Sequence, residues 1–244
     1  MTEQANYINC KSCSSKVFDS FCPNCGQSKD VKRINGKYIL SEIGSIFNLD
    51  KGIFYTIREL LLRPGKNIQN FILEDRKRLV KPIVYIIICS LTYTFLQQLL
   101  NFEDGYVNYS FEENTITSSI FEWVTKNYGY ANILISIFIA LWVKLLFRKN
   151  SYNIFEILIL LCFVIGTAML IFTVFGILDS LINYTIIDKG FFLGVLYISW
   201  GIGQFFNGNK LVNSLKGFAS YMLGLMTFTI LILMIGSLID WIIK

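Results

Sequence analysis

Residues 154–177 read IFEILILLCFVIGTAMLIFTVFGI, and this stretch decides the class of the protein. Beyond Glu156 it contains no charged residue. It is also longer than the roughly 20 apolar residues that an α-helix needs to cross the hydrocarbon core of a bilayer. A soluble protein of ordinary size has no use for such a stretch, since its helices are apolar on one face only. The sequence therefore predicts an integral membrane protein.

Four other apolar stretches accompany this one. The five predicted spans are residues 82–100, 130–146, 154–177, 191–206 and 218–243. The second and fourth are close to the lower limit of about 17 residues for a crossing, and the fourth is rich in glycine. A hydrophobic content of 54% and a mean hydropathy of +0.52 agree with this pattern. We expect an all-α integral membrane bundle of about five transmembrane helices over residues 82–244, with a kinked or re-entrant segment as the alternative for the fourth.

The charges of the connecting segments alternate along the chain. Residues 1–81 carry 14 Lys and Arg against 8 Asp and Glu, a net charge of +6. Residues 101–129, after the first span, are acidic, and the connection after the second span is basic again. Because cytoplasmic connections are enriched in Lys and Arg, this alternation predicts a cytosolic N-terminus and an external C-terminus.

Four cysteines stand close together near the N-terminus, Cys10, Cys13, Cys22 and Cys25, with the spacing C-x2-C-x8-C-x2-C. Two such pairs can place four thiolates around one ion, the ligand set of structural Zn²⁺ sites. Two disulfides would need an oxidising compartment, which the predicted topology disfavours. A redox Cys-x2-Cys usually accompanies a βαβ pattern, which is absent. Residues 1–30 are predicted to form a cytosolic zinc ribbon or knuckle, closed by four protein ligands.

A basic segment, residues 31–81, joins this module to the first span. Apolar residues spaced by three and four predict short amphipathic helices around residues 39–47, 53–61 and 68–72. The candidate contact residues are Arg63, Lys66, Arg76, Lys77, Arg78 and Lys81. Basic amphipathic helices beside a membrane are typical of the anionic headgroup layer. A solvated hairpin that contacts a protein partner is the alternative. Nucleic acid is disfavoured, because no stacking platform accompanies the charge.

The chain contains no histidine, which excludes Ser-His-Asp and Cys-His catalysis and the histidine-based metal sites. Lys144 and Glu156, near the cytosolic ends of the second and third spans, form a candidate intramembrane polar pair. Long side chains near helix ends also reach water by snorkelling, which is the plainer interpretation. The centres of all five stretches lack Asp, Glu, Lys and Arg, which disfavours ion-coupled transport. No catalytic residue is predicted.

Several short motifs in order carry a family resemblance: Cys22-Pro23-Asn24-Cys25-Gly26-Gln27, Leu49-Asp50-Lys51-Gly52, Thr56, Leu60, Arg63-Pro64-Gly65, Arg76 and Lys81-Pro82. Over about residues 7–100 the chain resembles the bacterial membrane-protein family known as domain of unknown function 3667. One departure is Glu74-Asp75, where the family usually carries a glycine ahead of Arg76. The resemblance implies a cytosolic zinc ribbon, a basic segment and several spans in a bacterial inner membrane. It implies no reaction.

Together these features favour a non-enzymatic membrane scaffold or adaptor, whose zinc ribbon docks a protein partner. One alternative is an oligomeric pore or transporter gated from the cytosolic side. A lipid-modifying membrane enzyme is a weaker alternative, because the chain lacks both histidine and paired carboxylates near the membrane. The expected partners are the bilayer, anionic headgroups and a protein, and assembly into a homo-oligomer stays open.

Overall fold

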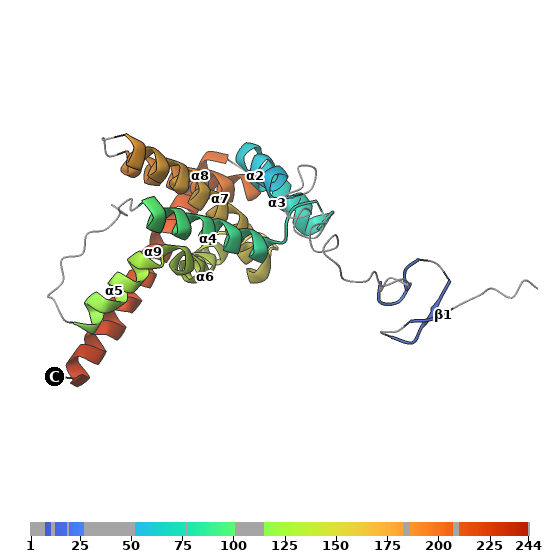
Figure 1. Ribbon diagram of the computed structural model, residues 1–244, viewed down its shortest axis with the longest axis horizontal. Helices are drawn as coiled ribbons and strands as arrows, with labels where there is room; N and C mark the ends of the chain where they lie inside the picture. Colours follow the sequence, from blue (N-terminus) through green and yellow to red (C-terminus); the bar gives the residue numbers. More distant parts are fainter. Residues whose placement is uncertain are drawn as a thin grey trace, which may run out of the picture. The chain divides into compact units, whose positions relative to one another are not determined.

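The chain divides into two compact units, Met1–Ser45 and Ile46–Lys244, and each is described by itself. The computed structural model describes residues 8–10, 13–18, 20–26, 52–76, 78–100, 115–182, 186–206 and 210–243. Figure 1 draws the elements of both units. The helix predicted around residues 39–47 lies outside the described residues. The remainder of the predicted juxtamembrane segment, from Ile46 onward, belongs to the larger unit.

The small unit contains a two-stranded antiparallel sheet of β1 (Ile8–Asn9) and β2 (Lys16–Val17). Ile8 lies opposite Val17 in this sheet. The buried side chains are Cys10, Val17 and Cys22. So small an apolar cluster cannot hold a fold without further cross-links, since domains below about 40 residues usually need disulfides or a metal. We call residues 8–26 of this unit the cysteine module.

The larger unit is helical in every element that the structure describes. Its helices are α2 (Ile53–Leu62), α3 (Pro64–Leu73), α4 (Pro82–Leu100), α5 (Ile116–Lys126), α6 (Tyr128–Leu146), α7 (Ile154–Leu181), α8 (Ile187–Phe205) and α9 (Lys210–Ile243). α2, α3, α4, α6 and α8 all pack against α7. Leu160, Phe163 and Val164 in α7 are completely buried. The most apolar stretch of the sequence is therefore the central helix of the unit.

Three helices are long and apolar enough to cross a membrane: Pro82–Leu100 of α4, Ile154–Leu181 of α7 and Leu211–Ile242 of α9. Tyr130–Leu146 of α6 is apolar but shorter, and α8 is not among the helices that meet these criteria in the described part of the chain. Each of the five predicted spans coincides with a helix. The membrane-like helical class is thus confirmed, whereas three helices rather than five have the length and hydropathy of a span.

The helices around α7 turn apolar side chains outward. On α4 these recur at every fourth residue, at Ile83, Ile87, Leu91, Phe95 and Leu99, and each is exposed. This spacing places them along one face of the helix. Monomeric soluble proteins rarely expose an apolar surface of this extent. A lipid bilayer is the solvent in which such a face is stable.

α5 and α6 follow each other with a break only at Asn127 and run antiparallel to α9. Gly224 of α9 leaves no room for a Cβ against the backbone of Ile139, and Gly236 leaves none against Thr117. α9 therefore has a close partner along most of its length. In Figure 1, α5 accompanies the C-terminal part of α9 away from the other helices.

Charge is distributed unequally between the two ends of the helical unit. Phe147 stacks on Phe206 with ring centroids 3.9 Å apart, and Tyr152 packs on Phe205, so the α6–α7 and α8–α9 connections meet at one end. We call this the positive end. Its described cations are Arg58, Arg63, Lys66, Arg76, Arg78, Lys81, Lys144, Arg148, Lys149 and Lys216, and its acidic residues are Glu59, Glu74, Asp75 and Glu156. The described charged residues of the opposite end are mainly carboxylates, Glu122, Asp179, Asp188 and Asp240, together with Lys189.

Two aspartates at that opposite end hold the starts of helices. The Asp179 carboxylate, near the end of α7, accepts the N–H of Ile186 at 2.7 Å, at the start of α8. The Asp240 carboxylate on α9 accepts the N–H of Ile116 at 2.6 Å and the hydroxyl of Thr117 at 2.8 Å. Amide groups in the first turn of a helix have no partner within the helix, so each carboxylate acts as a cap supplied by another helix.

Candidate metal centre and juxtamembrane hairpin

The two cysteine pairs lie in two turns of the same construction. Each turn continues past the second cysteine of its pair into a left-handed residue, Ser14 with φ 60° and Gly26 with φ 73°. The N–H of Ser14 donates to the carbonyl of Cys10 at 2.9 Å, and the N–H of Gly26 donates to the carbonyl of Cys22 at the same distance. The two cysteine pairs, which have the same spacing in the sequence, thus also have the same backbone conformation. This conformation turns both thiols of a pair toward one point.

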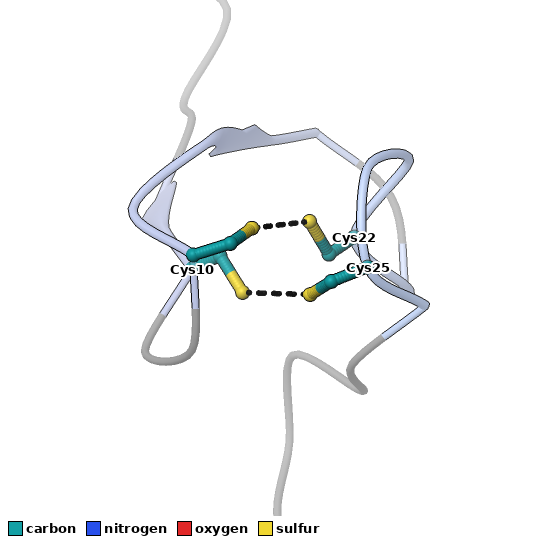
Figure 2. A group of neighbouring side chains, drawn as sticks. Cys10, Cys22 and Cys25 are labelled. Carbon is teal, nitrogen blue, oxygen red and sulfur yellow. Dashed lines mark hydrogen bonds between the residues drawn. The ribbon is translucent and has the colours of Figure 1, made fainter.

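The four sulfur atoms converge, all within 4.8 Å of one another. The Sγ atoms of Cys10 and Cys25 are 3.5 Å apart, as are those of Cys13 and Cys22. Figure 2 shows the thiols of Cys10, Cys22 and Cys25 turned toward one another. Four thiolates at about 2.3 Å from one ion in a tetrahedron would have their sulfurs about 3.8 Å apart. The donor set therefore fits a single metal ion, and all four cysteines are thiols rather than disulfides.

Neighbouring polar groups favour the metal-binding form of Cys13. Hydrogen bonds with the side chain and backbone of Ser15 lower the pKa of the Cys13 thiol to about 6. The thiolate, which is the form that binds metal, is therefore its major form at neutral pH. Asn24 Nδ2 donates to Ser15 Oγ at 3.2 Å and so links the two turns. With four protein ligands, an ion here has no open position for a substrate, which suits a structural role.

The surface of the cysteine module is unusually apolar for its size. Ile8, Phe18 and Phe21 are 49%, 54% and 63% exposed. These three side chains are larger than Val17, which the module buries together with Cys10 and Cys22. Exposed aromatic side chains are enriched at protein interfaces. The module thus combines an exposed apolar surface with a sulfur cluster in which Cys10 and Cys22 are buried, Cys13 is half-buried and Cys25 is exposed.

α2 and α3 form a helical hairpin, joined at Arg63 and referred to below as the hairpin. Asn67 Nδ2 closes its turn by donating to the carbonyl of Glu59 at 2.8 Å. Pro64 begins α3, where its missing N–H would have no helical partner in any case. The buried side of the hairpin comprises Ile53, Thr56, Leu60, Ile68, Phe71 and Ile72. It packs against α7 and α8, so the hairpin is a fixed part of the helical unit.

Two glutamines join the hairpin to α8 reciprocally. The N–H of Gly65, in the first turn of α3, donates to Gln204 Oε1 at 2.8 Å. Gln69 Nε2 donates to the carbonyl of Phe205, at the end of α8, at 2.6 Å. A Cβ on Gly65 would lie 2.4 Å from the carbonyl carbon of Gln204, which explains the glycine after Pro64. Each helix therefore supplies the partner that the terminus of the other lacks.

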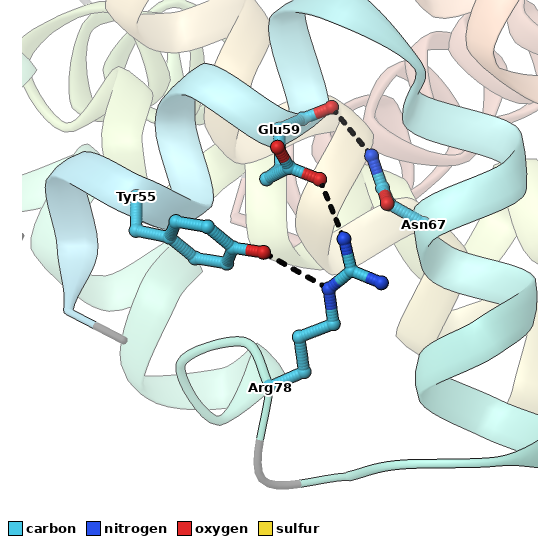
Figure 3. A network of polar contacts seen from close by, with 4 residues as sticks. All are labelled: Tyr55, Glu59, Asn67 and Arg78. Carbon is cyan, nitrogen blue, oxygen red and sulfur yellow. Dashed lines mark hydrogen bonds and ion pairs between the residues drawn. The ribbon is translucent and has the colours of Figure 1, made fainter. Parts of the chain in front are cut away.

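The segment after α3 folds back over α2 and is held by two polar contacts. Arg78 pairs with Glu59 at 2.9 Å and donates to the Tyr55 hydroxyl at 3.0 Å, as Figure 3 shows. The hydrogen bond with the Tyr55 hydroxyl and the charge of Glu59 raise the pKa of Arg78, against the opposing effect of burial. The Thr56 hydroxyl, completely buried, accepts the N–H of Val80 at 3.1 Å. These contacts set the position from which α4 begins.

The predicted contact residues fall into three groups. Arg63, Lys66, Arg76 and Lys81 are exposed, Arg78 is partly buried in the contact with Glu59, and Lys77 lies outside the described residues. The predicted intramembrane pair takes separate partners. Lys144 Nζ donates to the carbonyl of Tyr152 at 2.6 Å. Glu156 forms a capping box with Asn153 at the start of α7.

Sequence reasoning missed the residues that dock the hairpin. The hydroxyl of Tyr197 in α8 donates to the carbonyl of Leu60 at 3.1 Å, and Gln69 and Gln204 form the reciprocal contacts. A glutamine or tyrosine inside an apolar stretch is a signal in itself, because a buried polar group needs a partner. The sequence could not reveal which partner, since these contacts join residues that are far apart in the chain.

Residues 50–94 match the model of a family described as protein of unknown function (DUF3667). The match covers the hairpin and most of α4, and so includes Thr56, Leu60 and Gly65, whose structural roles are given above. The family resemblance is thereby confirmed for this part of the chain. No curated protein and no solved structure matches the chain.

Proposed function

We propose that the protein is a membrane-anchored docking scaffold. In this proposal the helical unit crosses a bacterial cytoplasmic membrane five times, and the cysteine module lies on the cytosolic side. The module holds one structural Zn²⁺ and binds a protein partner. The observation that carries the proposal is the pairing of a closed four-thiol site with three exposed apolar side chains on a module too small to bury them.

The distribution of charge supports the orientation. Cytoplasmic connections are enriched in Lys and Arg, and the positive end gathers the basic residues of the helical unit. α4 begins at that end, and the proposal assigns the cysteine module to the same side of the membrane. α8, the least apolar of the five, still presents Phe192, Leu196 and Trp200 outward at four-residue spacing, as a lipid-facing helix does.

The thiol-only donor set supports zinc. A tetrahedral set of four thiolates with no open position is the usual environment of structural Zn²⁺. When bound, the ion would supply most of the folding free energy of the module, about 10 kcal/mol or more in comparable peptides. Cys10, Cys13, Cys22 and Cys25 would hold the ion, and the left-handed turns at Ser14 and Gly26 would orient the thiolates.

The hydroxyl groups in the middle of α7 support a scaffold rather than a pore formed within one chain. The middle of α7 offers two hydroxyl side chains, and both are already used. Thr167 donates to the carbonyl of Phe163, and Thr173 donates to the carbonyl of Met169. A hydrophilic path needs polar groups that are available to water or ions. These two hydroxyl groups are therefore not available to line such a path.

Photo-crosslinking in the native cells tests the docking function. A photoreactive amino acid replaces Phe18 or Phe21 in the full chain, and Asn24, exposed on the same module, is the control position. The proposal expects a discrete protein adduct from positions 18 and 21, much less from 24, and loss of the adduct in Cys22→Ser/Cys25→Ser. Equal adducts from all three positions, or an adduct that survives the double substitution, would show that the folded module is not the docking element.

A further inference from the structure

The hairpin lies beside the helices of the unit rather than beyond their ends. The carbonyl of Leu60 accepts a hydrogen bond from the Tyr197 hydroxyl. Tyr197 precedes the end of α8 by about 12 Å, at a helical rise of 1.5 Å per residue. Phe71 packs edge-on against Phe163 of α7, with ring centroids 5.3 Å apart. Tyr85, in the first turn of α4, lies against the same Phe163 ring. The hairpin is therefore level with the first turn of a helix long and apolar enough to span a membrane.

The outward side of the hairpin combines apolar and basic side chains. The exposed apolar residues are Phe54, Leu61, Leu62 and Leu73, and the exposed basic residues are Arg58, Arg63 and Lys66. On α2, Phe54, Arg58 and Leu61 share one face, because they are separated by four and three residues. Leu62 and Leu73 are 62% and 68% exposed, whereas the leucines in the core of the unit are buried. Water alone is a poor solvent for such a face.

We propose that this face is a binding surface for anionic phospholipid, seated in the headgroup layer of the leaflet at the positive end. Phe54, Leu61 and Leu62 enter the boundary between headgroups and acyl chains. Arg58 and Lys66 bind lipid phosphates from the same depth. An interfacial helix buries its apolar face about 5–10 Å into this boundary, which agrees with the level fixed by Tyr85. The inference rests on the membrane part of the proposed function and not on the docking module.

Continuity with α4 favours lipid over a protein as the occupant. α4 begins shortly after the hairpin, and its first turns expose Ile83, Val84 and Ile87. The exposed apolar side chains of the hairpin and of the first turns of α4 thus lie at the same level, which Phe71 and Tyr85 fix by their contact with Phe163. The positive charge complements the anionic lipids of a cytoplasmic leaflet. Arg78 does not take part, because its guanidinium is held by Glu59 and Tyr55.

The test uses the purified full chain in nanodiscs of phosphatidylcholine, with increasing fractions of phosphatidylglycerol. Hydrogen–deuterium exchange of residues 53–73 reports the protection of the hairpin. We expect protection to rise with phosphatidylglycerol, and the apparent affinity of the hairpin for this lipid to fall roughly fivefold for each charge removed in Arg58→Gln/Lys66→Gln. The matched control, Arg148→Gln/Lys149→Gln, removes two exposed charges from the α6–α7 connection at the same end. Equal shifts in both variants would overturn the proposal, because general surface charge would then explain the effect.

A photoreactive amino acid at Leu62 gives an independent measure of the occupant. In the same nanodiscs, we expect mass spectrometry to find phospholipid adducts at position 62 and fewer at position 149. The absence of lipid adducts at 62, or protection that is the same with and without phosphatidylglycerol, would contradict the inference. The sample contains no other cellular protein, so this outcome is independent of the docking test, and recovery of the chain in nanodiscs separately reports its membrane insertion.

Discussion

Single residues in the cysteine module are constrained by backbone conformation. Ser14 and Gly26 stand at equivalent places in the two turns, and both have positive φ. Glycine adopts this conformation without a steric penalty, whereas serine incurs one of about 1 kcal/mol. The first turn therefore carries strain that the second does not, although the sequence spacing of the two pairs is identical.

This difference predicts opposite effects of two substitutions. Ser14→Gly should tighten metal binding about threefold to fivefold, corresponding to about 0.5–1 kcal/mol, and Gly26→Ala should weaken it by a similar factor. A Cβ at Gly26 meets no atom within 4 Å, so the second effect is purely conformational. Chelator competition with the full chain in detergent measures both. Ser20→Gly is the control, and an equal gain there would contradict the explanation.

Gly65 is constrained by contact rather than by conformation. Its Cβ would collide with the backbone of Gln204 and Phe205, which cannot move as a flexible side chain could. Gly65→Ala should therefore lower the free energy of unfolding by about 1–3 kcal/mol, the usual cost of overpacking. Thermal unfolding in detergent measures this loss. Lys66→Ala, at an exposed neighbour, should stay within about 0.5 kcal/mol of the parent, and equal losses would contradict the collision.

At the scale of elements, the hairpin and α8 complete each other. The glutamine contacts satisfy helix-terminal groups that have no partner within their own helix. The same logic applies at the opposite end, where Asp179 and Asp240 cap α8 and α5. Docking between elements thus depends on side chains that meet the ends of other helices.

Removing one glutamine should loosen the hairpin locally. Gln204→Leu leaves the N–H of Gly65 buried without its acceptor, which costs about 1–3 kcal/mol. Amide exchange in residues 64–73 should then accelerate about tenfold or more, while exchange in α6 stays unchanged. Gln98→Leu makes the same change at an exposed position of α4 and should leave the hairpin protected. Unaltered exchange in the Gln204 variant would show that the contact contributes little.

Removing the carboxylate of Asp240 should release α5 from α9. A charge-assisted cap contributes about 1.5–3 kcal/mol, so Asp240→Ala should raise exchange in residues 116–126 about tenfold or more. Exchange in α4 and α7 should not change, because neither touches this contact. Asp188→Ala, an exposed carboxylate in the first turn of α8, is the control. Similar exchange in both variants would contradict the capping role.

At the scale of the whole molecule, most of the helices could be predicted from the sequence. Hydropathy locates all five long helices, because an apolar stretch must be helical to satisfy its backbone in lipid. Hydropathy does not reveal that α5 and α6 are nearly continuous, since polar residues such as Glu122 and Asn127 interrupt the apolar pattern there. The docking of the hairpin was also missed, because residue spacing reveals an apolar face but not what covers it.

The convergence of the four cysteines was predictable for a different reason. They lie within sixteen residues, so their geometry depends on two local turns rather than on distant packing. The contacts of Lys144 and Glu156 show the opposite case. Each forms a hydrogen bond with a backbone group only a few residues away. A prediction that considers only opposite charges does not include such local bonds. Local constraints can be predicted from spacing, whereas competition among partners cannot.

One measurement tests most directly whether a metal-closed module lies on the cytosolic side of the membrane. A membrane-impermeant maleimide is applied to intact cells and to inside-out vesicles, with and without a zinc chelator, and labelled thiols are counted by mass spectrometry. The prediction is that Cys10, Cys13, Cys22 and Cys25 are labelled only in inside-out vesicles and only after chelation. Labelling in intact cells would contradict the orientation, and labelling in vesicles without chelator would contradict the metal centre.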